Sequence, residues 1–234
     1  MKTSLKVLSD EANYDPSPRK AKNVREAINL IKSGKCVSNI SDFNDNKVVM
    51  LLAVIRDGNN LEFASERLKK DREVVKAAVS NYGLALKYAD QTLKKDYEIA
   101  TLAIVNDGVA IKYVDESIID EIMVENAIQF SGGKSILWYL GTKFRSNAKI
   151  AMLAIESNLD EVNNIDESLY SNIGFINQLH SYLKHLYNRA GNNTIIKNRI
   201  KEIMIKLPLD DGTYDSDIHS VLCLTNPVNS AVII

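Results

Sequence analysis

An acid, a histidine and a cysteine come close together near the end of the sequence, as Asp217, His219 and Cys223. These residue types can form a nucleophilic site, in which a base activates the thiol and a third group orients the base. Such a site needs a rigid scaffold that holds the thiolate and the imidazole within hydrogen-bond distance. The surrounding segment contains Gly212, Pro227 and several serines. A plain loop is therefore the better interpretation of this segment than a catalytic site.

Two other patterns could suggest metal binding. His180 and His185 lie on one predicted helix but five residues apart, whereas helical metal-binding pairs use the i, i+4 spacing. An aspartate-rich stretch follows, but counting from Asp211 as the first residue of a calcium loop places Ser216 and Leu222 where glycine and glutamate are required. We therefore predict no metal site and no cofactor, and we interpret the two histidines as part of an exposed helix face.

Aromatic residues recur at a constant step of 25 residues, as Phe63, Tyr88, Tyr113 and Trp138. An exposed ladder of aromatic rings can stack nucleic-acid bases or a ligand. Aliphatic residues flank each of these positions at the same step, which is typical of a buried interface between repeated units. We therefore predict that the aromatic column fills the core.

A glycine column has the same period, with Gly58, Gly83, Gly108 and Gly133 each 25 residues apart. Given the 10 glycines in 234 residues, three further matches at one fixed step would arise by chance with a probability on the order of one in ten thousand. The chain is therefore a repeat protein. Other columns with this period are Val49, Val74, Ile99 and Val124, and also Leu61, Leu86, Ile111 and Ile136.

The clearest copy, residues 71–95, predicts one helix followed by a shorter helical or irregular segment. Asp71 is a good N-cap, and Glu73 places negative charge in the first turn, where the helix dipole favours it. Gly83 comes where a left-handed C-terminal cap is expected. Such a unit cannot bury its apolar face alone, but stacked copies can. The predicted fold is therefore all-α, an α-solenoid of short helical hairpins.

The positions at which the 25-residue repeat becomes irregular or stops predict the domain boundaries. We expect a flexible arm at residues 1–20 and the repeat array at 21–172, with the clearest copies at 46–145. A pair of capping helices follows at 173–208, and a tail at 209–234 is either disordered or related to secretion.

Charged residues beside the aromatic column also recur with the period. Lys87 and Lys112 precede two of the tyrosines, and Asp90 and Asp115 follow them. These residues are expected to form exposed rows along one edge of the array. A row of this kind is either a solvated face or a surface that binds a partner, and these four residues are the candidate partner-binding residues.

Composition and hydropathy exclude some classes of function. Twenty-nine basic and 30 acidic residues give a formal net charge of -1, without the basic excess of a nucleic-acid binder. The longest apolar run, residues 48–55, is far shorter than the roughly 20 residues of a membrane span. The N-terminus lacks the apolar core of a signal peptide, so we expect synthesis in the cytoplasm.

The phrase DREVVKAAVSNYGLALKYADQTLKKD resembles the tandem repeats catalogued as domain of unknown function 4116. Members of that family spell an acidic residue, then E-V-V, two alanines, and a G-x-A-L-x-Y-A segment. The family occurs in protists and in effectors that intracellular bacteria inject into host cells. The resemblance brings no catalytic residues, but it implies a bacterial effector that is translocated into the host cell.

These observations predict a helical repeat module that binds a protein partner, and the family resemblance implies that this partner is a host protein. The alternative is an effector enzyme. Its site would lie where the degenerate repeats after Gly133 meet the C-terminal helices, because irregular segments among regular repeats often carry function.

Overall fold

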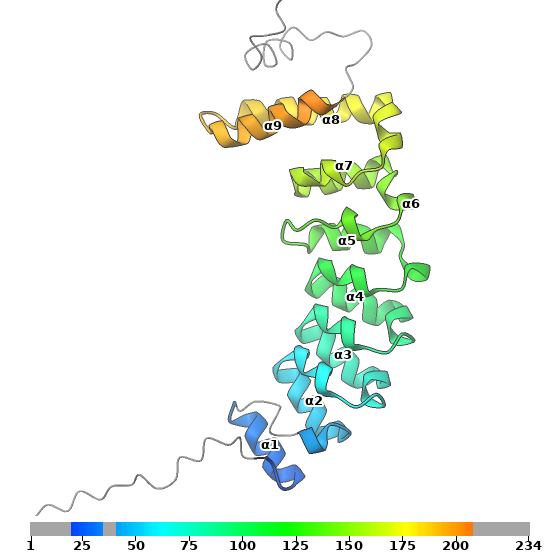
Figure 1. Cartoon of the computed structure of the whole chain (residues 1–234), viewed down its shortest axis with the longest axis vertical. Helices are drawn as coiled ribbons and strands as arrows, with labels where there is room; N and C mark the ends of the chain where they lie inside the picture. The colour runs from blue at the N-terminus through cyan, green and yellow to red at the C-terminus, as the bar shows by residue number, and fades with distance from the viewer. Residues whose placement is uncertain (1–19, 35–40, 208–234) are drawn as a thin grey trace, which may run out of the picture. The chain divides into compact units, whose positions relative to one another are not determined.

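A computed structural model of the chain describes residues 20–34 and 41–207, and all secondary structure in these ranges is helical (Figure 1). The all-α prediction is confirmed. The chain divides after Asn106 into two compact units, and each unit is described by itself. Most of the predicted arm and tail, including Asp217, His219 and Cys223, lies outside the described residues.

Unit 1 repeats one order of elements, an α-helix followed by two short 3-10 helices. A preceding helix α1 opens the unit, and α4 ends it. In Figure 1, α2, α3 and α4 lie side by side, and α3 packs against both of its neighbours. The elements are α1 (Val24–Lys32), α2 (Lys47–Arg56), η2 (Gly58–Phe63), η3 (Leu68–Lys70), α3 (Arg72–Asn81), η4 (Gly83–Tyr88), η5 (Leu93–Lys95) and α4 (Tyr97–Asn106).

Unit 2 begins with two 3-10 helices and ends with two longer α-helices, where a capping pair is predicted. Within it, α5 packs on α7, and α8 packs on α7 and α9. The elements are η6 (Gly108–Tyr113), η7 (Glu116–Ile118), α5 (Glu121–Gln129), η8 (Leu137–Tyr139), α6 (Thr142–Arg145), α7 (Ala148–Ser157), η9 (Leu159–Asn163), η10 (Glu167–Ser171), α8 (Ile173–Arg189) and α9 (Thr194–Lys206).

Short polar side chains start most of the α-helices. Asp71 accepts hydrogen bonds from the backbone N–H groups of Glu73 at 3.0 Å and Val74 at 3.2 Å, so its predicted role as an N-cap is confirmed. Each cap satisfies backbone donors that the first turn of a helix leaves unpaired. In α9 the cap is Asn193, whose side chain accepts a hydrogen bond from the N–H of Ile196.

The aliphatic columns of the repeat form the core of each unit. Val49, Val74, Ile99 and Val124 are all 0% exposed, and burying one such side chain stabilises the fold by about 1.5–3 kcal/mol. In η2, η4 and η6 the first residue and the residue three positions later are both buried, because residues three apart share a face of a 3-10 helix. The solenoid arrangement of the complete array stays a prediction.

The glycine column has a different role from the predicted one. Gly83 begins the 3-10 helix η4 and is not left-handed. A Cβ atom on Gly58 would lie 2.2 Å from the backbone oxygen of Ala78, and one on Gly108 would lie 2.0 Å from that of Ala127. These glycines therefore allow close approach of two backbone segments. Gly133 is left-handed, with φ of 78°.

Candidate functional site

The aromatic column lies at the surface, so the prediction that it fills the core is wrong. Phe63 is 48% exposed and Trp138 is 72% exposed, while Tyr88 and Tyr113 are half-buried. The reason is the period of the 3-10 helix, in which residues three apart share a face. One buried face of each segment carries a glycine, an aliphatic residue and a small or branched residue three positions apart, in the sets Gly58, Leu61 and Ala64; Gly83, Leu86 and Ala89; Gly108, Ile111 and Val114. The segments also bury Asn60, Ala85, Val109 and Ala110.

In unit 1 this column forms a patch that we name the unit 1 aromatic patch, consisting of Glu62, Phe63, Lys87 and Tyr88. The Lys87 ammonium lies 4.3 Å from the centroid of the Tyr88 ring. The Tyr88 hydroxyl donates a hydrogen bond to the Glu62 carboxylate at 2.9 Å. A cation over an exposed aromatic ring contributes about 0.5–1 kcal/mol. The patch therefore combines a positioned positive charge with the exposed phenyl ring of Phe63, which follows Glu62 in the chain.

The unit 2 aromatic patch consists of Lys112, Tyr113, Trp138 and Tyr139. The Lys112 ammonium lies 4.9 Å from the ring centroid of Tyr113 and 5.4 Å from that of Tyr139. Tyr139 is 38% exposed and its neighbour Trp138 is the most exposed of these aromatic residues. One lysine thus bridges two tyrosines beside a solvent-facing indole.

Asp90 and Asp115 have structural contacts that the sequence did not predict. Each begins a turn: Asp90 accepts from the N–H of Thr92 at 3.0 Å and its hydroxyl at 2.7 Å, and Asp115 accepts from the N–H of Ser117 at 3.0 Å. The backbone N–H of Thr92, followed by its hydroxyl, lowers the pKa of Asp90 below its ordinary value. Both carboxylates help to fold the chain, and their contact with a partner stays a prediction.

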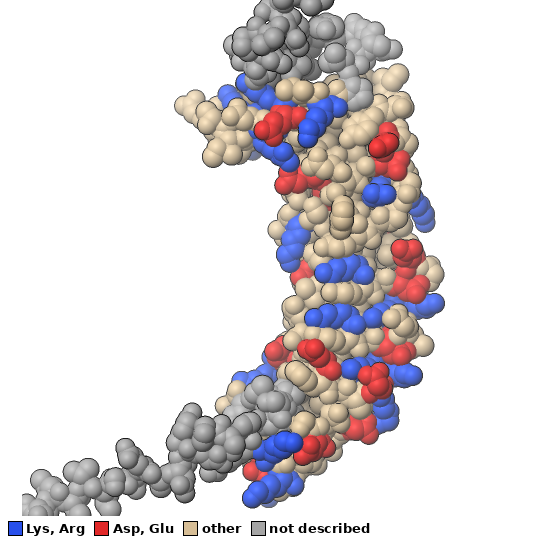
Figure 2. Space-filling view, in the orientation of Figure 1, with Lys and Arg blue, Asp and Glu red and all other residues tan. Residues whose placement is uncertain are grey.

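Many other surface charges pair between successive copies. Lys47 contacts the carboxylates of Asp71 at 2.9 Å and Glu73 at 2.8 Å, and Arg72 contacts Asp96 at 2.9 Å. The hydrogen bond from Arg72 is the main cause of a lowered pKa at Asp96. On the face seen in Figure 2, basic and acidic side chains accordingly lie interleaved.

These ion pairs were not predicted from the sequence, although the spacing of the charged residues indicates them. A cation directly follows the helix cap in one copy, and an acidic cap comes 24 residues later. Because these charges neutralise one another across neighbouring copies, they stabilise the array and are less suited to binding a partner.

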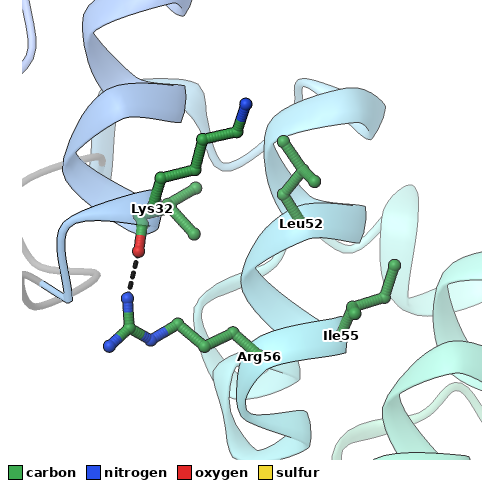
Figure 3. Close-up of a pocket in the computed structure, with 5 residues that line it drawn as sticks. Lys32, Leu52, Ile55 and Arg56 are labelled. Atoms are coloured by element: carbon green, nitrogen blue, oxygen red, sulfur yellow. Dashed lines mark hydrogen bonds between the residues drawn. The ribbon is translucent and has the colours of Figure 1, made fainter.

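A groove lies between α1 and α2 (Figure 3). Its volume is about 430 Å³, and it is lined by Ile31, Lys32, Leu52, Ile55 and Arg56. Arg56 donates a hydrogen bond from Nη1 to the Ile31 carbonyl. Leu52 is half-buried, and Ile55 is 58% exposed. The groove therefore combines an apolar wall with two cations, and the sequence did not indicate it.

The region predicted for the alternative enzyme site contains a buried carboxylate, that of Glu161, which is 1% exposed. This carboxylate accepts hydrogen bonds from the backbone N–H groups of Ile136 and Leu137, the latter at 3.1 Å. Its other oxygen accepts from the Asn164 amide at 2.7 Å. Glu161 thus anchors the segment before η8, and these contacts give it a structural role.

The two histidines on α8 differ in exposure, with His180 half-buried and His185 exposed. Within the described ranges, no group of three or more His, Cys, Asp or Glu side chains is placed to hold a metal ion.

Comparison with known families identifies the central repeats. The family described as "Domain of unknown function (DUF4116)" matches residues 49–94 and, overlapping them, residues 71–119. The resemblance to DUF4116 is confirmed for these residues. The two DUF4116 matches run from α2 to the end of η7, and their overlap is expected for tandem copies. No curated protein and no solved structure matches the chain.

The search for membrane spans covered the described residues. None of the helices there has the length and apolar character needed to cross a bilayer.

Proposed function

We propose that this chain is a protein-binding helical repeat module. The observation that carries the proposal is the exposure of the aromatic column, with Phe63 at 48% and Trp138 at 72%. Exposed apolar side chains that gather in a patch rimmed by polar residues mark protein-protein interaction sites. Aromatic side chains at the centre of an interface also contribute a large share of binding energy.

The lysines of the two patches add a second element to this surface. Lys87 and Lys112 are held over tyrosine rings at 4.3 Å and 4.9 Å, so less side-chain freedom is lost when a partner binds. Each patch combines an apolar contact area with a positive charge. The partner is therefore expected to present carboxylates next to an apolar surface.

We further propose that the module acts as a translocated bacterial effector and that its partner is a host protein. The support for this step is the family resemblance, because repeats of this family occur in effectors that intracellular bacteria inject. The binding proposal depends on the aromatic patches and stands without the effector proposal.

Affinity capture from host-cell lysate tests the binding proposal. The baits are the full chain, the double variant Lys87→Glu/Lys112→Glu, and the control variant Lys95→Glu/Lys143→Glu. Lys143 is a matched control because its ammonium also lies over an aromatic ring, 4.9 Å from the Phe144 centroid. Thermal unfolding of the three chains shows whether all of them are folded.

The proposal expects one protein to be captured in stoichiometric amount by the wild type and the control. The patch variant should retain at least about tenfold less of it, a change of about 1.4 kcal/mol in binding free energy. Equal retention by all three baits would show that the aromatic patches are not the interface.

A further inference from the structure

At the groove between α1 and α2 the chain departs from the repeat at one position. Position 56 corresponds to positions 81 and 106, where the chain has asparagine. Asn81 joins two successive helix ends with a short side chain, whose amide donates a hydrogen bond to the Ile55 carbonyl at 3.1 Å. Arg56 makes the corresponding link to Ile31 with the far end of its long side chain. The two helix ends are therefore held by a longer connection, which leaves space for a groove.

An apolar stripe on α2 borders this groove. Val48, Leu52 and Ile55 follow the i, i+4, i+7 spacing of one helix face, and Val48 and Ile55 are 57% and 58% exposed. The corresponding positions of α3 hold glutamate, alanine and serine at residues 73, 77 and 80. The exposed apolar stripe is thus a property of α2 that α3 does not share.

The two charged residues that line the groove, Lys32 and Arg56, are both basic. Lys32 and Arg56 reach into it from the ends of α1 and α2 (Figure 3). Among the residues that the structure describes, no carboxylate pairs with either of them. At the other end of α2, in contrast, Lys47 is paired with both Asp71 and Glu73. The cations of the groove are therefore available to carboxylates from outside the unit.

We propose that this groove binds an acidic, amphipathic helical segment of a partner protein. The apolar side chains of that segment pack on Leu52 and Ile55, and its carboxylates pair with Lys32 and Arg56. An apolar helix face lying in a groove with anchors at i, i+3, i+4 and i+7 is a common mode of peptide recognition. The groove volume of about 430 Å³ lies within the range of small binding sites, about 300–1,000 Å³. This site is separate from the aromatic patches.

Peptide display tests the proposal. A library of short randomised peptides is selected on the full wild-type chain and counter-selected on the Ile55→Asp variant. The enriched peptides should combine acidic residues with apolar residues at helical spacing. Their affinity, measured by fluorescence anisotropy, should fall at least about tenfold, or about 1.4 kcal/mol, in Ile55→Asp and in Lys32→Glu. Lys32→Glu leaves the hydrogen bond from Arg56 to the Ile31 carbonyl intact. It therefore tests the charge of the groove without the risk of unfolding that a substitution of Arg56 carries.

The variant Lys87→Glu/Lys112→Glu should bind the same peptides with unchanged affinity, which separates this site from the proposed function. Three results would overturn the proposal: no enrichment, enrichment of basic peptides, or peptides that bind Ile55→Asp as tightly as the wild type. A concentration-dependent dimer that Ile55→Asp abolishes would also overturn it, because the groove would then bind a second copy of the chain.

Discussion

Asn81 and Gly58 are joined across two successive copies of the repeat, with the Asn81 side-chain oxygen accepting a hydrogen bond from the Gly58 N–H at 2.7 Å. The same amide donates to the Ile55 carbonyl at 3.1 Å. Asn106 repeats this arrangement on Gly83 at 2.6 Å. One asparagine thus satisfies two backbone groups that would lack a partner where a helix ends. The link is part of what holds neighbouring copies together.

Replacement of Asn81 by alanine is expected to destabilise the chain. The variant leaves a partly buried N–H group of Gly58 without its acceptor, and such a loss costs about 1–3 kcal/mol. Urea unfolding followed by circular dichroism measures the change. Asn177→Ala on the exposed side of α8 is the control, with an expected change within about 0.5 kcal/mol. Equal effects of the two variants would show that the link contributes nothing.

Gly58→Ala and Gly133→Ala are expected to differ in severity, although both glycines belong to one column. At Gly58 the new Cβ would meet a backbone oxygen at 2.2 Å, and forcing an atom into such a space costs about 1–3 kcal/mol or more. At Gly133 the Cβ meets nothing within 4 Å, and only the positive φ of 78° opposes it, at about 1–2 kcal/mol. The free energy of unfolding is measured for both variants. A larger loss of stability in Gly133→Ala than in Gly58→Ala would contradict the close backbone approach at Gly58.

Trp138→Ala should leave the stability of the chain almost unchanged, within about 0.5 kcal/mol, because the indole is exposed. The adjacent Leu137 is 0% exposed, and Leu137→Ala should cost about 2–5 kcal/mol. Thermal or urea unfolding of the two variants measures both effects. A loss at Trp138 as large as the loss at Leu137 would place the tryptophan in the core and remove the basis of the binding proposal.

The ion pair of Asp96 with Arg72 predicts a pH dependence of stability. The pKa of Asp96 is lowered in the folded chain, chiefly by the hydrogen bond from Arg72. The stabilisation is therefore fully present above the unfolded pKa of about 3.9, and it is lost as the pH falls through the folded pKa. Carboxyl NMR titration should show the pKa of Asp96 rising in Arg72→Ala but not in the control Lys94→Ala. An unchanged pKa in Arg72→Ala would refute the pairing.

Much of the fold could be predicted because its signals are local or periodic. The cap at Asp71 follows from side-chain chemistry, and the buried columns such as Val49 and Val74 follow from the constant step of 25 residues. The role of Gly58 could not be predicted in this way. Its requirement for space comes from the Ala78 carbonyl of the next copy, and the sequence alone does not show that approach.

The candidate site was harder to predict than the fold. The lysines and aromatic residues are recognisable as recurring positions, but the aliphatic residues that flank Phe63 and Trp138 at the same step indicate a buried interface, which the structure contradicts. The 3-10 period buries Leu61 and turns Phe63 outward. The groove is lined by residues of α1 and α2, among them Arg56 where the next copies have asparagine, and their proximity is visible only in the folded chain.

Hydroxyl-radical footprinting of the complex captured from lysate tests whether the exposed aromatic column is the binding surface. It compares the oxidation of individual side chains in the free chain with their oxidation in the bound chain. If the aromatic column is the binding surface, Phe63 and Trp138 are oxidised less in the bound chain than in the free chain. The oxidation of Tyr187 on α8 should be the same in both. Unchanged oxidation of both Phe63 and Trp138, together with protection elsewhere, would contradict the claim that the exposed aromatic column is the binding surface.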